Sequence, residues 1–154
     1  MVTQQMLSKH NYGLRDVAVD GLWRGALAGA AMAGYLMIAT AVLGDNPLAV
    51  LSRFTSQGVE VTPLAGAIAH LAVSAIYGAV FAVLWRLVAR RSNSGALALV
   101  GALLFSGFLF FTAELILLPS VQSPMLAVPA LHFGIGHLVY GLVLGGLMAR
   151  SQHA

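Results

Sequence analysis

Two histidines and one glutamate lie at similar depths inside long apolar stretches of this sequence, where ionisable side chains are rare. They are His70, Glu114 and His132. Two imidazoles on neighbouring helices can be the axial ligands of a b-type haem, and two imidazoles with one carboxylate can bind a metal ion. A carboxylate with a histidine can also pass protons, as at a quinol site or in a transporter. The alternative is structural, with each group hydrogen-bonding a neighbouring helix.

The depth of these residues within their apolar stretches is what could bring them together. At about 1.5 Å per residue, His70 lies ~10 Å from the start of the second stretch, and Glu114 ~6 Å from the end of the third. His132 lies between ~5 and ~12 Å into the fourth. His70 and His132 are therefore the predicted cofactor-binding residues, with haem b as the cofactor they would hold. Glu114 is a predicted proton or polar site.

His137, Tyr77 and Tyr140 are further polar side chains in the same stretches. Helical periodicity places Tyr77 on the face of His70 and Tyr140 on the face of His132, whereas His137 points ~140° away from His132, among glycines. Each tyrosine hydroxyl needs a hydrogen-bond partner in apolar surroundings. We count all three as predicted polar-site residues whose default role is packing.

The elements that position these residues are predicted to be membrane-spanning helices. Of the 154 residues, 59% are hydrophobic and only 8% are charged, whereas a soluble domain carries about 25% charged residues. Apolar stretches long enough to span a bilayer lie at about 19–43, 63–89, 96–118 and 126–148. A short segment at about 47–54 is predicted to be a helix on the membrane surface. The predicted fold is an all-α integral membrane four-helix bundle, in a single domain.

Capping signals predict where these helices begin. Asp20 is expected to cap the first helix and Ser94 the third, and Asn46-Pro47 opens the surface helix with proline at its first position. The fourth span begins at either Ser123-Pro124 or Val128-Pro129.

Small residues recur every fourth position in the first stretch, at Gly21, Gly25, Gly29 and Ala33. Such a ridge lets the backbone of a neighbouring helix approach closely. We expect this ridge to be used for packing inside the bundle.

The basic residues predict the orientation, because cytoplasmic loops carry an excess of lysine and arginine. With the amino terminus in the cytoplasm, Arg53 alone lies outside. The inner side then holds Lys9, Arg15, Arg24, Arg86, Arg90, Arg91 and Arg150. Both termini are therefore expected to be cytoplasmic.

Several classes of function are excluded or disfavoured. The absence of cysteine removes disulfides, thiolate metal sites and covalent haem attachment. The sequence has no Gly-rich phosphate loop, no His-Glu-x-x-His motif and no nucleophile elbow, so we favour a role that is not enzymatic. The eight basic residues do not form a run, so we expect no nucleic-acid partner.

Four motifs give the chain a resemblance to a known group. They are Gly25-x-x-x-Gly29, Asn46-Pro47, the segment from His70 to Tyr77-Gly78, and His137-Leu-Val-Tyr140-Gly141. With them the chain resembles small four-helix bacterial inner-membrane proteins of unassigned function. The resemblance implies a bacterial cytoplasmic membrane and implies no activity and no site residue.

We expect this chain to be an accessory or structural subunit of a larger membrane assembly, in particular an electron-transfer one. Its partners would be the lipid bilayer and other membrane subunits or further copies of itself. The alternatives are a redox protein that binds haem or a metal through His70 and His132, and a proton-coupled transporter that uses Glu114.

Overall fold

The computed structural model describes residues 13–55, 62–88 and 94–150, and every regular element in these ranges is a helix. The long helices are α1 (Leu14–Val42), α3 (Pro63–Val88), α4 (Gly95–Thr112) and α6 (Ala130–Arg150). The π-helix η1 (Ala113–Leu117) and α5 (Leu118–Ser120) extend α4. Two short helices, α2 (Pro47–Ser52) and η2 (Pro124–Ala127), lie in the connections. Four helical stretches are long and apolar enough to cross a membrane. The prediction of an all-α fold with four helices of membrane-spanning length is thus confirmed.

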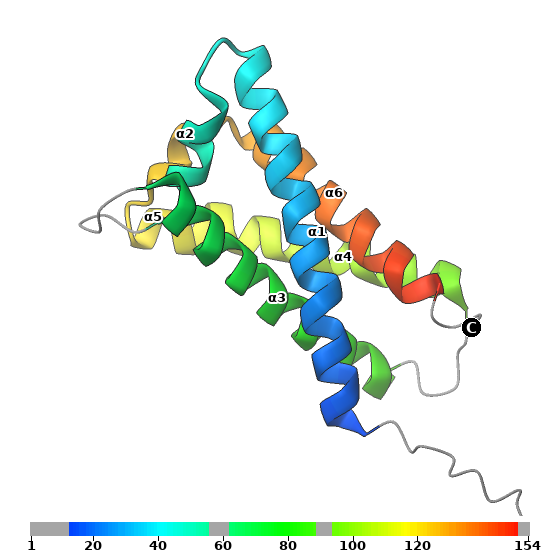
Figure 1. The fold of residues 1–154 in the computed structure, drawn as a ribbon. Coiled ribbons are helices and arrows are strands. Elements are labelled where there is room, and N and C mark those ends of the chain that lie inside the picture. The colour runs from blue at the N-terminus through cyan, green and yellow to red at the C-terminus, as the bar shows by residue number, and fades with distance from the viewer. Residues whose placement is uncertain (1–12, 56–61, 89–93, 151–154) are drawn as a thin grey trace, which may run out of the picture.

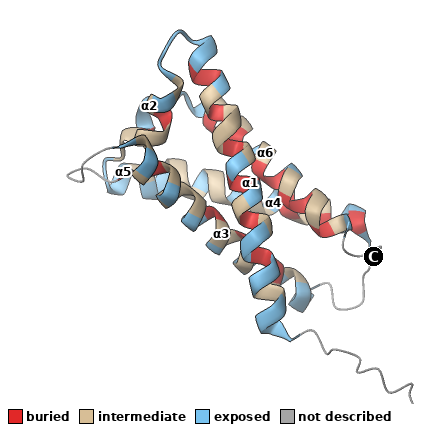
Figure 2. Ribbon diagram, in the orientation of Figure 1, coloured by how far each residue is buried: buried red, intermediate tan, exposed pale blue. Residues whose placement is uncertain are grey.

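Helix α1 is the centre of the bundle (Figure 1). It packs against α3 on one side and α6 on the other, and α4 packs against α6. Buried residues follow α1 and α6, while the outer faces of the helices are exposed (Figure 2). The bundle therefore consists of two tight pairs, α1–α3 and α4–α6, joined through the contact between α1 and α6.

The helices α3 and α4 touch little. Where they meet, the rings of Phe81 and Phe105 lie 5.3 Å apart. One turn further along, the side chain of Trp85 lies against Gly101. The contact of Trp85 with Gly101 lies near the end of α3 and the start of α4. Toward the opposite end, formed by α2, α5 and η2 and called here the α2 end, the two helices are separated by the cavity described below.

The close pairing of α1 and α3 depends on glycine. A Cβ atom at Gly25 would lie 2.7 Å from the Cα atom of Gly78, and one at Gly21 would lie 2.7 Å from the Gly78 carbonyl oxygen. A Cβ atom at Gly29 would lie closer still to the side chain of Ser74. The small-residue ridge therefore packs inside the bundle, as predicted.

The pair α4–α6 uses glycine in the same way. A Cβ atom at Gly145 would lie 2.8 Å from the Cα atom of Leu99, and one at Gly141 would lie 3.0 Å from the carbonyl oxygen of Ala102. Both glycines are on α6, so α6 is the member of the pair that lacks side chains at the contact.

The start of α1 differs from the prediction. The helix begins at Leu14 and not near position 19, because the Gly13 N–H donates to the carboxylate of Asp16 at 2.9 Å. The prediction that Asp20 caps this helix is wrong, since Asp20 lies within it and pairs with Arg24.

The other capping predictions are confirmed. The Asn46 side chain accepts a hydrogen bond from the Leu48 N–H at 2.9 Å, with Pro47 at the first helical position. Ser94 caps α4. Of the two alternatives for the fourth span, α6 follows Pro129, whereas Pro124 begins the separate turn η2.

A widened helical turn surrounds Glu114. Pro119 has no N–H, and in a regular α-helix its ring would collide with the carbonyl group of Leu115. The helix is instead widened into a π-helix just before Pro119, where the Leu118 N–H donates to the carbonyl oxygen of Ala113, five residues back. The helix thus passes through Pro119 to Ser120, beyond the predicted end at about 118.

Candidate functional site

A partly open cavity of about 220 Å³ lies at the α2 end of the bundle and is called here the α3–α4 cavity. Its edge includes Val73 on α3 and Leu117 in η1, which are 47% and 45% exposed. The mouth therefore faces outward between these two helices. Polar side chains from several elements line the cavity together with apolar ones: His70, Ser74, Tyr77, Ser123, His137 and Tyr140.

His70 is held in the wall of the cavity by α1 and by the residues after α2. Its Nε2 atom lies 3.0 Å from the carbonyl oxygen of Gly29, and its ring stacks on Phe54 with centroids 4.0 Å apart. A carbonyl oxygen can only accept, so Nε2 carries the proton of this hydrogen bond. The contact ties α3 to α1 and fixes the orientation of the imidazole.

His137 is buried in the same wall, with 8% of its surface exposed. Its Nδ1 atom donates to the carbonyl oxygen of Phe133, one turn earlier on α6, at 3.0 Å. The imidazole meets the rings of Phe133 and Phe110 edge to face, with centroids 4.5 and 5.7 Å away. The prediction that His137 sits with glycines is therefore incomplete, because aromatic rings hold it.

Tyr140 connects helices that are far apart in sequence. Its hydroxyl group donates to the carbonyl oxygen of Ser74 at 2.8 Å, which joins α6 to α3. Tyr77 also lines the cavity, and its hydroxyl group forms no hydrogen bond with another residue in the described part of the chain.

Replacing Tyr140 with phenylalanine should lower the free energy of unfolding by about 1 kcal/mol, because the Ser74 carbonyl oxygen loses a buried partner. Unfolding of the detergent-solubilised protein by increasing sodium dodecyl sulfate measures the change. Tyr77→Phe is the matched control and should leave the midpoint unchanged. Equal losses in both variants would contradict the role given to the Tyr140 hydroxyl.

His132 lies elsewhere. Its Nδ1 atom is 3.1 Å from the hydroxyl oxygen of Tyr35, and the residue lines a second cavity of about 120 Å³ with Asp45 and Arg53. The structure therefore does not bring His70 and His132 into one cavity. No three metal-binding side chains gather anywhere in the described ranges.

Glu114 does not line the α3–α4 cavity. It lies in η1 and is partly exposed, and no hydrogen bond or ion pair joins it to another described residue. Glu114, His70 and His132 were predicted to lie at a similar depth, but the structure does not bring them into contact with one another.

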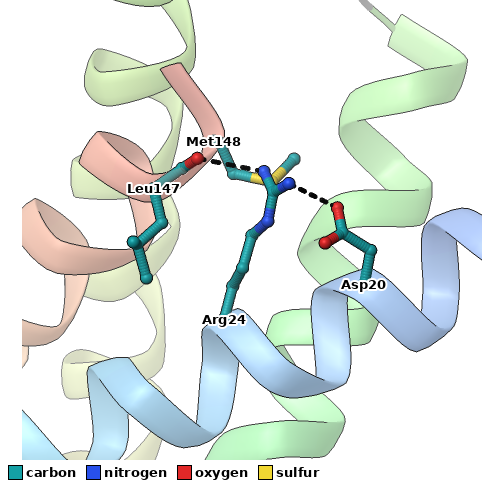
Figure 3. Close-up of polar contacts among 4 residues, drawn as sticks. All are labelled: Asp20, Arg24, Leu147 and Met148. Atoms are coloured by element: carbon teal, nitrogen blue, oxygen red, sulfur yellow. Dashed lines mark hydrogen bonds and ion pairs between the residues drawn. The ribbon is translucent and has the colours of Figure 1, made fainter. Parts of the chain in front are cut away.

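Arg24 has a structural role that the sequence did not reveal. It donates to the carbonyl oxygen of Leu147 at 3.1 Å and to the sulfur of Met148 at 3.0 Å, and it forms an ion pair of 2.6 Å with Asp20 (Figure 3). Leu147 is in the last turn of α6, where carbonyl groups have no partner within the helix. Arg24 therefore caps α6 and ties it to α1.

Several residues of the α3–α4 cavity were not predicted from sequence. Phe54 was assigned only to the surface helix, while Leu109 and Met125 carry no signal beyond being apolar. They come from three separate segments, and only the folded chain shows that they line one space.

Comparisons with models of known families, with curated proteins and with solved structures find no match to this chain.

Proposed function

We propose that this protein is an accessory subunit of a larger membrane assembly, in particular an electron-transfer one, and that it holds a bilayer-soluble molecule in the α3–α4 cavity. The observation that carries the proposal is the cavity, with its mouth between two membrane-spanning helices. A molecule dissolved in the hydrocarbon would reach this space without entering water.

The size and lining of the cavity suit a small ring compound. An engineered cavity of about 150 Å³ holds benzene, and the α3–α4 cavity is larger, at about 220 Å³. Ligand sites are typically apolar with a few well-placed polar groups. Met32, Leu109 and Phe133 supply the apolar wall, and the histidines and tyrosines supply the polar groups.

We propose the bacterial cytoplasmic membrane as the location, and the arginines support an orientation with both termini in the cytoplasm. Arg15 is in the first turn of α1, and Arg86 and Arg150 are in the last turns of α3 and α6. These helix ends lie opposite the α2 end of the bundle, where Arg53 follows α2 (Figure 1). Lys9, Arg90 and Arg91 lie outside the described residues. This placement puts the cavity in the outer half of the bilayer. It is tested with a cysteine introduced at Ser120, which an impermeant maleimide should label from the periplasm.

Transport of protons is the second candidate, favoured by the position of Glu114 in a π-helix. Such turns occur frequently at functional sites, and a carboxylate without a described partner is unusual at membrane depth. Glu114→Gln should then abolish proton flux in liposomes, and unchanged flux would reject this role. The haem and metal hypotheses gain no support, because His70 and His132 line separate cavities.

Retention of a bilayer molecule after mild extraction tests the proposed function. Native mass spectrometry of the gently solubilised protein should show a bound small molecule together with partner polypeptides. Ala113→Leu should lose the small molecule, because the added atoms enter the cavity that Ala113 lines. Gly107→Leu is the control on α4, since a side chain there meets open space and retention should not change.

A lone polypeptide with an empty cavity would contradict both parts of the proposal. If partner polypeptides are found without a bound small molecule, the ligand-binding part of the proposal is contradicted and the accessory role is supported.

A further inference from the structure

We propose that the α3–α4 cavity binds a hydroxylated aromatic ring of the quinol class in preference to the corresponding quinone. This inference rests on the ligand-binding part of the proposed function and not on any partner subunit. It concerns binding and no reaction. It follows from the hydrogen bonds that the N–H and O–H groups lining the cavity already donate to backbone carbonyl groups.

Each of the two histidines that line the cavity already donates its N–H to a backbone carbonyl group. A neutral imidazole has one N–H, and an imidazolium would be costly in such an apolar space. His70 donates through Nε2 to Gly29, so its Nδ1 atom is left as an acceptor. His137 donates through Nδ1 to Phe133, so its Nε2 atom is left as an acceptor.

The hydroxyl group of Tyr140 also already donates its hydrogen bond to a backbone carbonyl group. Its hydroxyl proton is directed to the carbonyl oxygen of Ser74, which leaves only lone pairs on the phenolic oxygen. Three polar groups of the lining thus accept hydrogen bonds and cannot donate without losing a contact between helices or along α6. The hydroxyl groups of Tyr77 and Ser123 can take either role.

A ligand with hydroxyl groups matches this lining better than one with carbonyl groups. A quinol donates two hydrogen bonds, whereas a quinone only accepts and would leave buried acceptors facing acceptors. An unmatched buried polar group weakens binding substantially. The phosphodiester and ester groups of a phospholipid would be a poor match for the same reason, because their oxygens only accept.

The shape of the lining favours a flat ring. The aromatic side chains of Phe54, Tyr77, Phe133 and Tyr140 line the cavity, and aromatic rings attract one another in offset or edge-to-face arrangements. The mouth between Val73 and Leu117 would let an apolar tail extend into the bilayer while the ring stays inside.

Binding of tetramethyl-1,4-benzoquinol and of tetramethyl-1,4-benzoquinone to the purified full chain tests the inference. Equilibrium dialysis against detergent micelles, without oxygen for the quinol, gives both dissociation constants. We expect saturable binding of the quinol, about tenfold tighter than that of the quinone.

Two substitutions should weaken the preference for quinol over quinone while keeping an aromatic ring in place. His70→Phe and His137→Phe each delete one acceptor, and in either variant the ratio of the two dissociation constants should fall several-fold. His132→Phe is the matched control, because His132 lines the other cavity and the ratio should stay that of the unsubstituted protein. Ala113→Leu should weaken binding of both compounds, since it fills space without removing an acceptor.

The inference is overturned if the quinone binds as tightly as the quinol, or if His132→Phe changes the ratio as much as His137→Phe. Tight binding of a phospholipid that displaces the quinol would also overturn it. If neither ring compound binds and mass spectrometry shows no retained molecule, the ligand-binding function itself fails.

Discussion

Replacing Gly25 with leucine is expected to force α1 and α3 apart and to lower the free energy of unfolding by about 3 kcal/mol or more. The contact is between backbones. An added Cβ atom would meet the carbonyl oxygen of Ser74 and would lie 2.7 Å from the Cα atom of Gly78. Main-chain atoms of a packed helix cannot rotate away as a side chain can, so the helices must separate. The structures of the membrane-spanning helices themselves should survive.

The measurement is unfolding in detergent followed by circular dichroism and by intrinsic fluorescence. Gly34→Leu is the control on the same helix, where an added Cβ atom meets nothing within 4 Å. It should change the unfolding midpoint little. A Gly25→Leu protein as stable as Gly34→Leu would show that α1 and α3 do not approach as closely as the structure places them.

Leucine at Gly145 is expected to destabilise the second helix pair by a similar amount, about 3 kcal/mol. An added Cβ atom there would lie 2.8 Å from the Cα atom of Leu99 and 3.0 Å from the Cβ atom of Ala102. Since α4 packs mainly on α6, its position would no longer be fixed, and the wall of the cavity that α4 supplies would move with it.

The neighbouring glycine provides an unusually close control. An added Cβ atom at Gly146 meets nothing within 4 Å, so Gly146→Leu should leave both the unfolding midpoint and quinol binding unchanged. Gly145→Leu should lower both. Loss of binding without loss of stability in Gly145→Leu would contradict the packing explanation.

The sequence predicted the helices well because length, apolar content and capping chemistry are local properties. Asn46, Pro47 and Ser94 mark helix starts through groups within three residues of them. The first helix begins earlier than its apolar run because residues such as Arg15 and Asp16 can be helical whether or not lipid surrounds them. The π-helix at Ala113–Leu117 was not predicted, although its cause, Pro119, is visible in the sequence.

The site could be predicted only in part, since depth along a helix says nothing about which helix lies opposite. His70, His137, Tyr77 and Tyr140 do share one cavity. His132 lies at a similar depth but turns toward Tyr35 and a different space. The pairing of α3 with α1, and of α4 with α6, decides this outcome, and it depends on glycine contacts between distant segments.

The contact between Arg24 and Leu147 has a consequence for how the protein is made. The two residues are 123 positions apart, so the ribosome produces Arg24 long before the carbonyl group it meets. Until α6 has been synthesised, the Leu147 carbonyl group and the Met148 sulfur that Arg24 contacts do not yet exist. The contact that ties the first long helix to the last one therefore forms only after almost the whole chain has been made.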